Sequence, residues 1–202
     1  MKIICVGRNY GEHAKELGNE IPEDPVIFMK PDTAILKKGS DFYIPEFSDD
    51  IHYELEVVLK ISKGGKYIRK ENAGKHFDEI GLGIDFTARD LQSKLKDKGL
   101  PWELAKGFDG SAVVSDFVSK DNYDLQNLNF SLTKNNEKAQ HGNTSEMIFS
   151  PEDIIAFASQ YFTLRVGDLI FTGTPKGVGK VSENDILEAY LENEKLFSLK
   201  IQ

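Results

Sequence analysis

The sequence has little cysteine, no net positive charge and no long apolar run, and each shortage excludes a class of protein. A single cysteine, Cys5, cannot form an intrachain disulfide, so we expect a protein of the reducing cytoplasm. The net charge of −8 argues against nucleic acid or an anionic membrane as the partner. No apolar run is long enough to span a bilayer, and the N-terminus lacks a signal-peptide pattern.

What remains is the composition of a globular protein, with 40% hydrophobic and 29% charged residues. A chain of 202 residues can bury a substantial core, and it contains neither an internal repeat nor a low-complexity linker. We therefore expect a single domain over residues 1–202.

Short apolar runs predict many strands and a few helices. Helices are expected from Tyr10 to Leu17 and from Ala88 to about Lys98 behind a Thr87/Asp90 capping box. A third is expected after Ser150, where Ser150 and Asp153 repeat the capping-box spacing and Pro151 takes the first helical position. Gly64-Gly65 predicts a hairpin turn after the strand that carries Glu54 and Glu56. With no regular alternation of strands and helices, the fold class is α+β with a largely antiparallel or mixed sheet. The other expected strands are 2–6, 26–29, 112–118, 128–134, 168–172, 186–191 and 196–201.

Three acidic residues carry most of the functional information. Glu54 and Glu56 alternate with Leu55, Val57 and Leu59, so a strand would place both glutamates on one face. Asp85 lies in a second segment that is otherwise glycine and apolar residues. Convergent carboxylates suit Mg²⁺ or Mn²⁺ rather than a soft metal. The alternative is a solvated strand face with Asp85 as a turn residue.

Two further groups could contribute chemistry. His13 and Glu16 are three residues apart on a predicted helix, so the carboxylate could orient the imidazole as a general base. An incidental surface pair is the alternative. Lys30 and Lys106 lie in mostly apolar runs, where a lysine either reaches solvent or holds its charge against an anion.

The segment Thr172 to Gly179 is rich in glycine but does not match a phosphate-binding loop. Val181 follows the Gly-Lys pair where serine or threonine is required, and no helix is expected after it. A bend whose backbone amides approach a small carboxylate and a purely structural turn both remain open.

Together these segments resemble the fumarylacetoacetate hydrolase family, in particular its single-domain acylpyruvase/oxaloacetate decarboxylase branch. The matching segments occur in family order over nearly the whole chain: Gly7-Arg8-Asn9-Tyr10, Phe28-Met29-Lys30-Pro31, Glu54-Leu55-Glu56, Asp85 to Gln92, Gly99-Leu100-Pro101-Trp102, Gln140 to Thr144, and Thr172-Gly173-Thr174-Pro175.

The resemblance implies a mixed β-roll with flanking helices, as in the C-terminal domain of fumarylacetoacetases, usually in a homodimer. It implies one Mg²⁺ or Mn²⁺ held by Glu54, Glu56 and Asp85. The catalytic residues implied are His13, Glu16 and Lys106; the substrate-binding residues implied are Arg8, Lys30, Arg89, Gln92 and Thr174.

The reaction implied is metal-dependent hydrolysis of a C–C bond in acylpyruvate-type 2-oxo acids, or decarboxylation of oxaloacetate, through a pyruvate enolate that the metal and Lys106 stabilise. An isomerase or tautomerase of 2-hydroxy-diene or 2-oxo dicarboxylates would need the same metal and only proton transfers. A third reading is an inactive homologue that binds a metabolite. The expected partner is a small 2-oxo acid.

Overall fold

The computed structural model describes residues 1–11 and 21–202. His13, Glu16 and most of the helix predicted from Tyr10 to Leu17 lie outside these residues. All structural statements below concern the described part of the chain.

The largest sheet is mixed and contains residues from the whole length of the chain. Its strands follow the order β2-β1-β11-β4-β5-β7, and β8 pairs with β5 beside this path. The pair β1 and β11 is parallel, whereas the other pairs are antiparallel. The strands are β1 (Ile3–Gly7), β2 (Val26–Lys30), β4 (Leu55–Ile61), β5 (Phe77–Asp85), β7 (Ala112–Val114), β8 (Val118–Ser119) and β11 (Leu169–Phe171).

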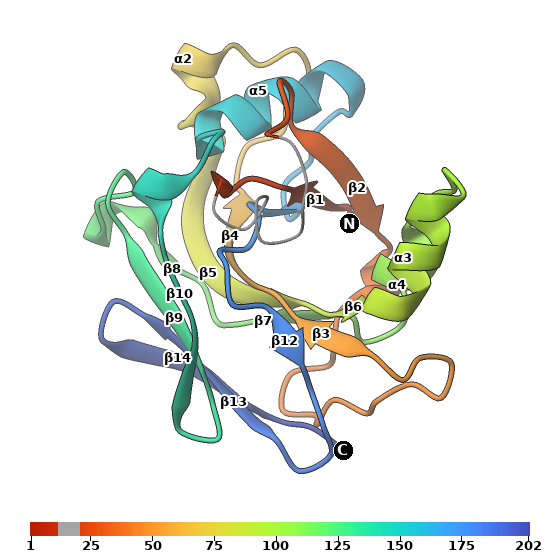
Figure 1. Cartoon of the computed structure of the whole chain (residues 1–202). Coiled ribbons are helices and arrows are strands. Elements are labelled where there is room, and N and C mark those ends of the chain that lie inside the picture. Colours follow the sequence, from red (N-terminus) through yellow and green to blue (C-terminus); the bar gives the residue numbers. More distant parts are fainter. Residues whose placement is uncertain (12–20) are drawn as a thin grey trace.

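Two smaller sheets complete the roll. One has the order β10-β9-β13-β14 and the other the order β12-β3-β6. In Figure 1 the strands curl around a common interior, and β5 bends along one side of it. Their bounds are β3 (Ile51–Tyr53), β6 (Thr87–Ala88), β9 (Asn129–Lys134), β10 (Glu137–Asn143), β12 (Gly179–Lys180), β13 (Ile186–Leu191) and β14 (Glu194–Lys200).

The interior is one apolar cluster shared by the sheets. Leu82 of β5, Leu132 of β9 and Leu187 of β13 belong to it and are completely buried. In β9 and β13, buried apolar residues alternate with more exposed ones and supply the inward face, whereas β5 is buried on both faces from Ile80 to Asp85. The predicted α+β class and mixed β-roll are confirmed.

Four α-helices lie on the outside of the roll among the described residues, and none of them is long and apolar enough to cross a membrane. In α5, Ser150 Oγ accepts from Asp153 N at 3.2 Å and the Asp153 carboxylate accepts from Ser150 N, so the capping box predicted there is confirmed. The helices are α2 (Lys70–Ala73), α3 (Arg89–Asp97), α4 (Glu103–Lys106) and α5 (Pro151–Tyr161), with short 3-10 turns at Asp32–Ala34, Lys120–Asn122 and Thr144–Glu146.

The second predicted capping box is wrong. Thr87 lies in β6, and its hydroxyl contacts Lys106 Nζ at 2.6 Å instead of capping α3. Ala88 is the N-cap residue and makes no side-chain cap. The expected hairpin at Gly64-Gly65 is also longer than predicted, because α2 separates the paired strands β4 and β5.

Candidate metal centre

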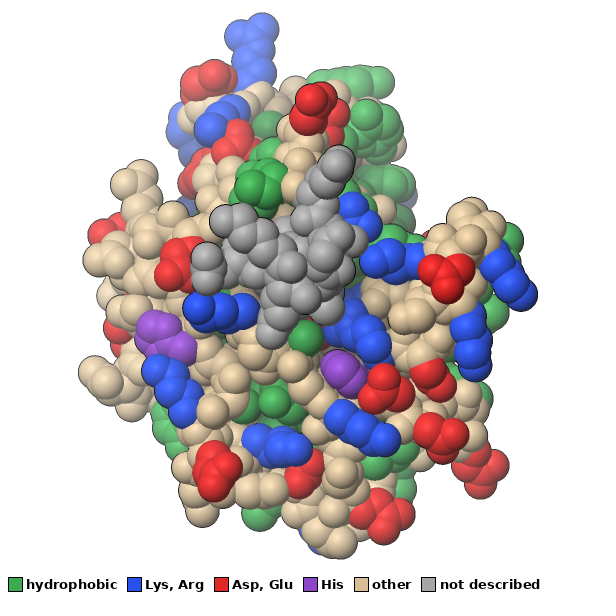
Figure 2. Space-filling model, in the orientation of Figure 1, with side chains coloured by type: hydrophobic (Ala, Val, Ile, Leu, Met, Phe, Trp, Pro, Cys, Tyr) green, Lys and Arg blue, Asp and Glu red, His purple; other side chains and the backbone are tan. Residues whose placement is uncertain are grey.

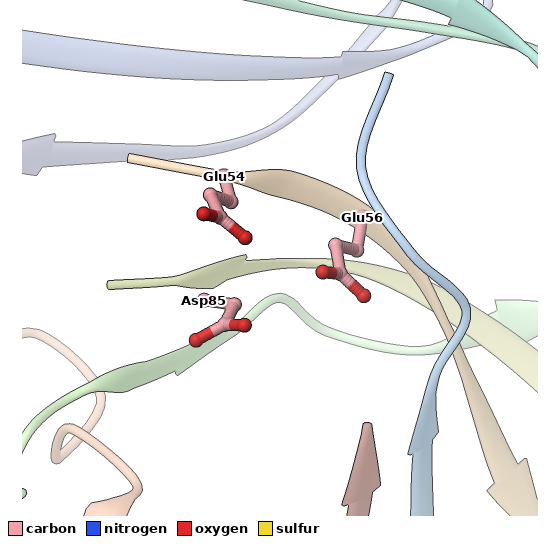
Figure 3. Close-up of side chains that lie close together, drawn as sticks. All are labelled: Glu54, Glu56 and Asp85. Atoms are coloured by element: carbon pink, nitrogen blue, oxygen red, sulfur yellow. The ribbon is translucent and has the colours of Figure 1, made fainter. Parts of the chain in front are cut away.

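The fold brings together the carboxylates of Glu54, Glu56 and Asp85. Glu54 lies between β3 and β4, Glu56 lies in β4, and Asp85 is the last residue of β5. Antiparallel pairing of β4 with β5 sets the register, and Asp85 N donates to Glu54 O at 2.9 Å. One ligand oxygen of each residue lies within 4.8 Å of the others. Figure 3 shows the three side chains pointing toward one region.

These carboxylates are buried, with relative exposures of 5%, 2% and 0% for Glu54, Glu56 and Asp85. Burial raises the pKa of Glu56 well above its usual range, and the neighbouring charges of Asp85 and Glu54 raise this pKa further. A hydrogen bond from Gly173 N to Glu56 Oε2, 2.7 Å long, acts in the opposite direction. Three acids in one buried place therefore need a positive charge nearby.

Lys106 supplies one such charge. Its Nζ lies 2.9 Å from Glu54 Oε2 and 2.7 Å from Asp85 Oδ2. Burial alone lowers the pKa of Lys106, but the attraction of Asp85 and Glu54 outweighs burial, so this pKa lies above its ordinary value. Arg89 also pairs with Glu54, from the start of α3. The ammonium of Lys106 is thus kept protonated beside the acids.

Lys30 lies behind the site rather than in it. Its side chain is completely buried, with Nζ 2.7 Å from Asp85 Oδ1 and 3.0 Å from Ser111 Oγ. Nζ also donates to the carbonyl of Lys106. The structure therefore does not support the predicted direct contact between Lys30 and a substrate, because Asp85 and the Lys106 backbone occupy its donors. Its charge supports Asp85 instead.

The donor set fits a hard divalent cation. All three donors are carboxylate oxygens, which Mg²⁺ and Mn²⁺ prefer. Asp85 Oδ1 is buried and is paired with Lys30 Nζ alone, at 2.7 Å; because a carboxylate oxygen has two lone pairs, it keeps one for a metal. Glu54, Glu56 and Asp85 are therefore the residues that could hold the ion.

A small cavity of about 50 Å³ opens onto the acidic trio. The predicted substrate-binding residues Arg8, Arg89, Gln92 and Thr174 all line it, as does Lys106. Arg89 Nη1 donates to Gln92 Oε1 at 2.7 Å, which orients the guanidinium. The remaining lining residues are Val6, Gly7, Phe28, Lys96 and Trp102. Apart from Lys30, the predicted site residues that the structure describes thus gather around one cavity.

The loop after β11 is built to approach Glu56. Gly173 has a φ of 100°, and a Cβ there would lie 2.7 Å from the Cβ of Asn9. Asn9 is buried and holds the loop through Nδ2, which donates to Thr172 O at 2.8 Å. Gly173 N donates to Glu56 Oε2, a carboxylate of the same chain, so this bend has a structural role, and its approach to a small bound carboxylate stays a prediction.

Gln140 of β10 is a buried residue that connects two parts of the site, and its sequence motif predicted no role for it. Its Nε2 donates to Thr174 Oγ1 at 2.8 Å and to Pro175 O at 3.0 Å. Its Oε1 accepts from Leu55 N, between the two glutamates, at 2.9 Å. Gln140 therefore fixes the metal-binding strand relative to the loop that carries Thr174. Its place in the quoted motif was the only signal for it in the sequence.

The family model for the C-terminal part of fumarylacetoacetate (FAA) hydrolase matches residues 2–200. The chain belongs to this family. Among its relatives, the mitochondrial oxaloacetate tautomerase FAHD1 of Bos taurus is 42% identical over 201 residues, which are 99% of this chain and 91% of that protein. The mitochondrial oxaloacetate decarboxylase of Dictyostelium discoideum is 43% identical over 189 residues, covering 93% of this chain and 87% of that protein.

One similar protein of known structure was crystallised with a metal ion and a small oxo acid. The fumarylpyruvate hydrolase of Pseudomonas aeruginosa, crystallised in complex with Mn²⁺ and pyruvate, is 34% identical to this chain. The TM-score is 0.93, and the alignment covers 100% of this chain and 89% of the hydrolase. The family members thus named are enzymes, which supports the prediction that this chain is an enzyme.

Proposed function

We propose that this chain is a Mg²⁺- or Mn²⁺-dependent enzyme that interconverts the keto and enol forms of oxaloacetate. The single observation that carries the proposal is the buried acidic trio with Lys106 in one cavity. The resemblance implied C–C hydrolysis first. We prefer tautomerisation because a relative named as a tautomerase aligns over 99% of this chain.

The metal would act as a Lewis acid that polarises the 2-oxo group of a bound acid. Lys106 would place its ammonium close to the oxygen on which negative charge develops in the enolate, since Nζ already lies beside Glu54 and Asp85. Arg89, oriented by Gln92, would bind the carboxylate next to the 2-oxo group. The Thr174 hydroxyl, held by Gln140, would donate or accept a hydrogen bond at the same end.

Hydrolysis or decarboxylation of a 2-oxo acid is the second candidate. It is supported by the decarboxylase relative and by the hydrolase that binds Mn²⁺ and pyruvate. All three reactions pass through an enolate, so the same metal and lysine serve each of them. Tautomerisation needs a group that takes and returns the C3 proton, and hydrolysis needs a base for water. The predicted base pair of His13 and Glu16, which could serve either step, lies outside the described residues.

The remaining alternative is an inactive homologue. The buried carboxylates and Lys106 argue against it, because grouping such charges without a ligand is unfavourable. The homodimer, the single domain and the cytoplasmic location of this chain stay predictions.

The test is a set of three initial-rate assays on the metal-depleted protein before and after Mn²⁺ is restored. Ketonisation of enol-oxaloacetate is followed by ultraviolet absorbance, pyruvate release by a coupled dehydrogenase, and acylpyruvate loss by absorbance. We expect Mn²⁺-dependent ketonisation to be the fastest reaction. Faster acylpyruvate cleavage would favour the hydrolase, and no reaction in any assay would contradict the enzyme.

A matched pair of variants ties the activity to the site. Glu56→Gln removes a metal ligand and should abolish Mn²⁺-dependent turnover. Glu79→Gln makes the same change in an ion-paired glutamate at the exposed end of β5 and should leave the rate unchanged. Equal effects of the two substitutions would contradict the assignment of Glu56.

A further inference from the structure

Lys30 is a completely buried lysine whose ammonium is enclosed by acceptors. It is the last residue of β2, and neither its side chain nor that of Asp85 is exposed. Its Nζ lies 2.7 Å from Asp85 Oδ1, 3.0 Å from Ser111 Oγ and 3.2 Å from Ser111 O, and it donates to the Lys106 carbonyl. An ammonium has three hydrogens, so each of them has an acceptor here. Because a buried ion pair adds little net stability, the role of Lys30 lies in the arrangement that it enforces.

The partners of Lys30 are themselves fixed by the fold. Ser111 is completely buried, and its hydroxyl donates to the same Lys106 carbonyl at 2.8 Å. The chain after α4 packs closely on the residue after β2, since a Cβ on Gly107 would lie 3.1 Å from Pro31 Cδ. Lys30 therefore joins the aspartate of the acidic trio to the end of α4, and this aspartate cannot turn without breaking the whole cluster.

Each of the three acids has one oxygen held by a donor from the chain. Gly173 N donates to Glu56 Oε2 at 2.7 Å, and Arg89 pairs with Glu54 Oε1. Lys30 does the same for the third acid, from the buried side of the site. A carboxylate that is held at one oxygen is not free to swing both oxygens toward a cation. Partners of this kind orient metal ligands, and their loss typically changes metal affinity by about 10–100-fold.

Rigid ligands discriminate between divalent cations of different size. Mg²⁺ requires nearly octahedral geometry at about 2.0–2.1 Å, whereas Ca²⁺ takes roughly six to eight oxygens at about 2.3–2.6 Å and accepts both oxygens of one carboxylate. Exposed acids do not make this distinction, because they can turn toward either ion. Figure 2 shows acidic and basic side chains scattered over the visible face of the molecule. Selectivity for one cation therefore has to come from the buried trio and the donors that hold it.

We infer that Lys30 is a positioning residue that keeps Asp85 from presenting both oxygens to a metal, so that the site binds Mg²⁺ in preference to Ca²⁺. This inference rests on the metal site of the proposed function. It gives the buried ammonium a role that fits its place behind Asp85, where its donors are already occupied. Without Lys30, the carboxylate of Asp85 would be able to turn, and the larger ion would gain the additional oxygen that it accepts.

The experiment titrates the metal-depleted protein with Mg²⁺ and, separately, with Ca²⁺ in a calorimeter, and the readout is the ratio of the Kd for Ca²⁺ to the Kd for Mg²⁺. Both ions carry two charges, so the loss of a nearby positive charge favours both and cancels in this ratio. Lys30→Met removes the ammonium. Ser111→Ala removes one of its acceptors without a change of charge, and it decides the test if Lys30→Met does not fold. The control is Lys120→Met, which removes a lysine that donates to the Gly74 and Phe77 carbonyls at the far end of β5.

The wild type should bind Mg²⁺ more tightly than Ca²⁺, and Lys30→Met should lower the Kd ratio about tenfold, the lower end of the effect of such partners. Ser111→Ala should lower the ratio by a smaller factor, and Lys120→Met should leave it unchanged. Tighter binding of Ca²⁺ by the wild type, or a ratio unchanged in Lys30→Met (in Ser111→Ala if Lys30→Met does not fold), would overturn the inference while Mn²⁺-dependent ketonisation still supported the proposed function. A wild-type protein that binds none of Mg²⁺, Ca²⁺ and Mn²⁺ would overturn both.

Discussion

Replacement of Lys106 by methionine should have opposite effects on metal binding and on catalysis, because the Lys106 ammonium lies among the acids that would bind the metal. Its Nζ lies within 2.9 Å of both Glu54 and Asp85, and 5.0 Å from the centre of the Phe28 ring. Methionine keeps most of the side-chain volume and removes the charge. Breaking a buried ion pair from one side typically costs about 3–5 kcal/mol, so metal-free Lys106→Met should lose stability of that order.

Mn²⁺ should bind the same variant more tightly. Two unit charges 4 Å apart interact by about 1 kcal/mol even in water, and a divalent ion doubles this repulsion to about 2 kcal/mol. Because Lys106→Met removes this repulsion, the variant should bind Mn²⁺ more than about tenfold more tightly than the wild type. The rate of oxaloacetate ketonisation should nevertheless fall, because the donor to the enolate oxygen is gone.

Urea unfolding of the metal-free protein and calorimetric titration with Mn²⁺ measure the two effects. The control is Lys60→Met, which breaks the half-exposed 2.6 Å pair with Glu79 and should change stability by less than about 1 kcal/mol. Weaker Mn²⁺ binding by Lys106→Met than by the wild type would refute the reasoning, since it would mean that the lysine organises the acids rather than opposing the metal.

Two further predictions concern the scaffold. Asp168 accepts from the backbone amides of Lys2 and Arg165, both at 2.8 Å; burial raises its pKa, but these bonds and the Lys2 ammonium outweigh burial and lower it. A carboxyl group whose pKa is lower in the folded than in the unfolded protein stabilises the fold at any pH above its unfolded pKa, which is near 4. Asp168→Asn should therefore lower the free energy of unfolding in urea at pH 7 by about 1–3 kcal/mol. This stability difference between wild type and variant should shrink as the pH falls through the folded pKa of Asp168. Ser150→Ala removes the cap of α5 and should cost about 1 kcal/mol, whereas the same change at exposed Ser93 should cost less; equal losses would contradict the capping argument.

The sequence was most informative where the signal was local. Alternation of Leu55, Val57 and Leu59 with the acids predicted that Glu54 and Glu56 share a face, and the structure places both carboxylates together. The cap at Ser150 was likewise readable, because it depends only on neighbouring residues. The order of the family motifs then predicted the β-roll and most of the residues that line the cavity.

Local signals failed where distant residues compete. Thr87 has the spacing of a helix cap, but Lys106, distant in sequence, takes its hydroxyl. The strand Glu137–Asn143 is too polar to predict from propensity and forms because β9 pairs with it. Partners of this kind come from tertiary packing, which periodicity does not contain.

The most direct test of the account is an anomalous difference map from crystals of the wild-type protein grown with Mn²⁺. We expect a peak bonded to one oxygen each of Glu54, Glu56 and Asp85, at about 2.0–2.2 Å, with coordination positions left for a 2-oxo acid. No peak between these side chains, or carboxylates that still contact only Lys106 and Arg89 at saturating Mn²⁺, would contradict it.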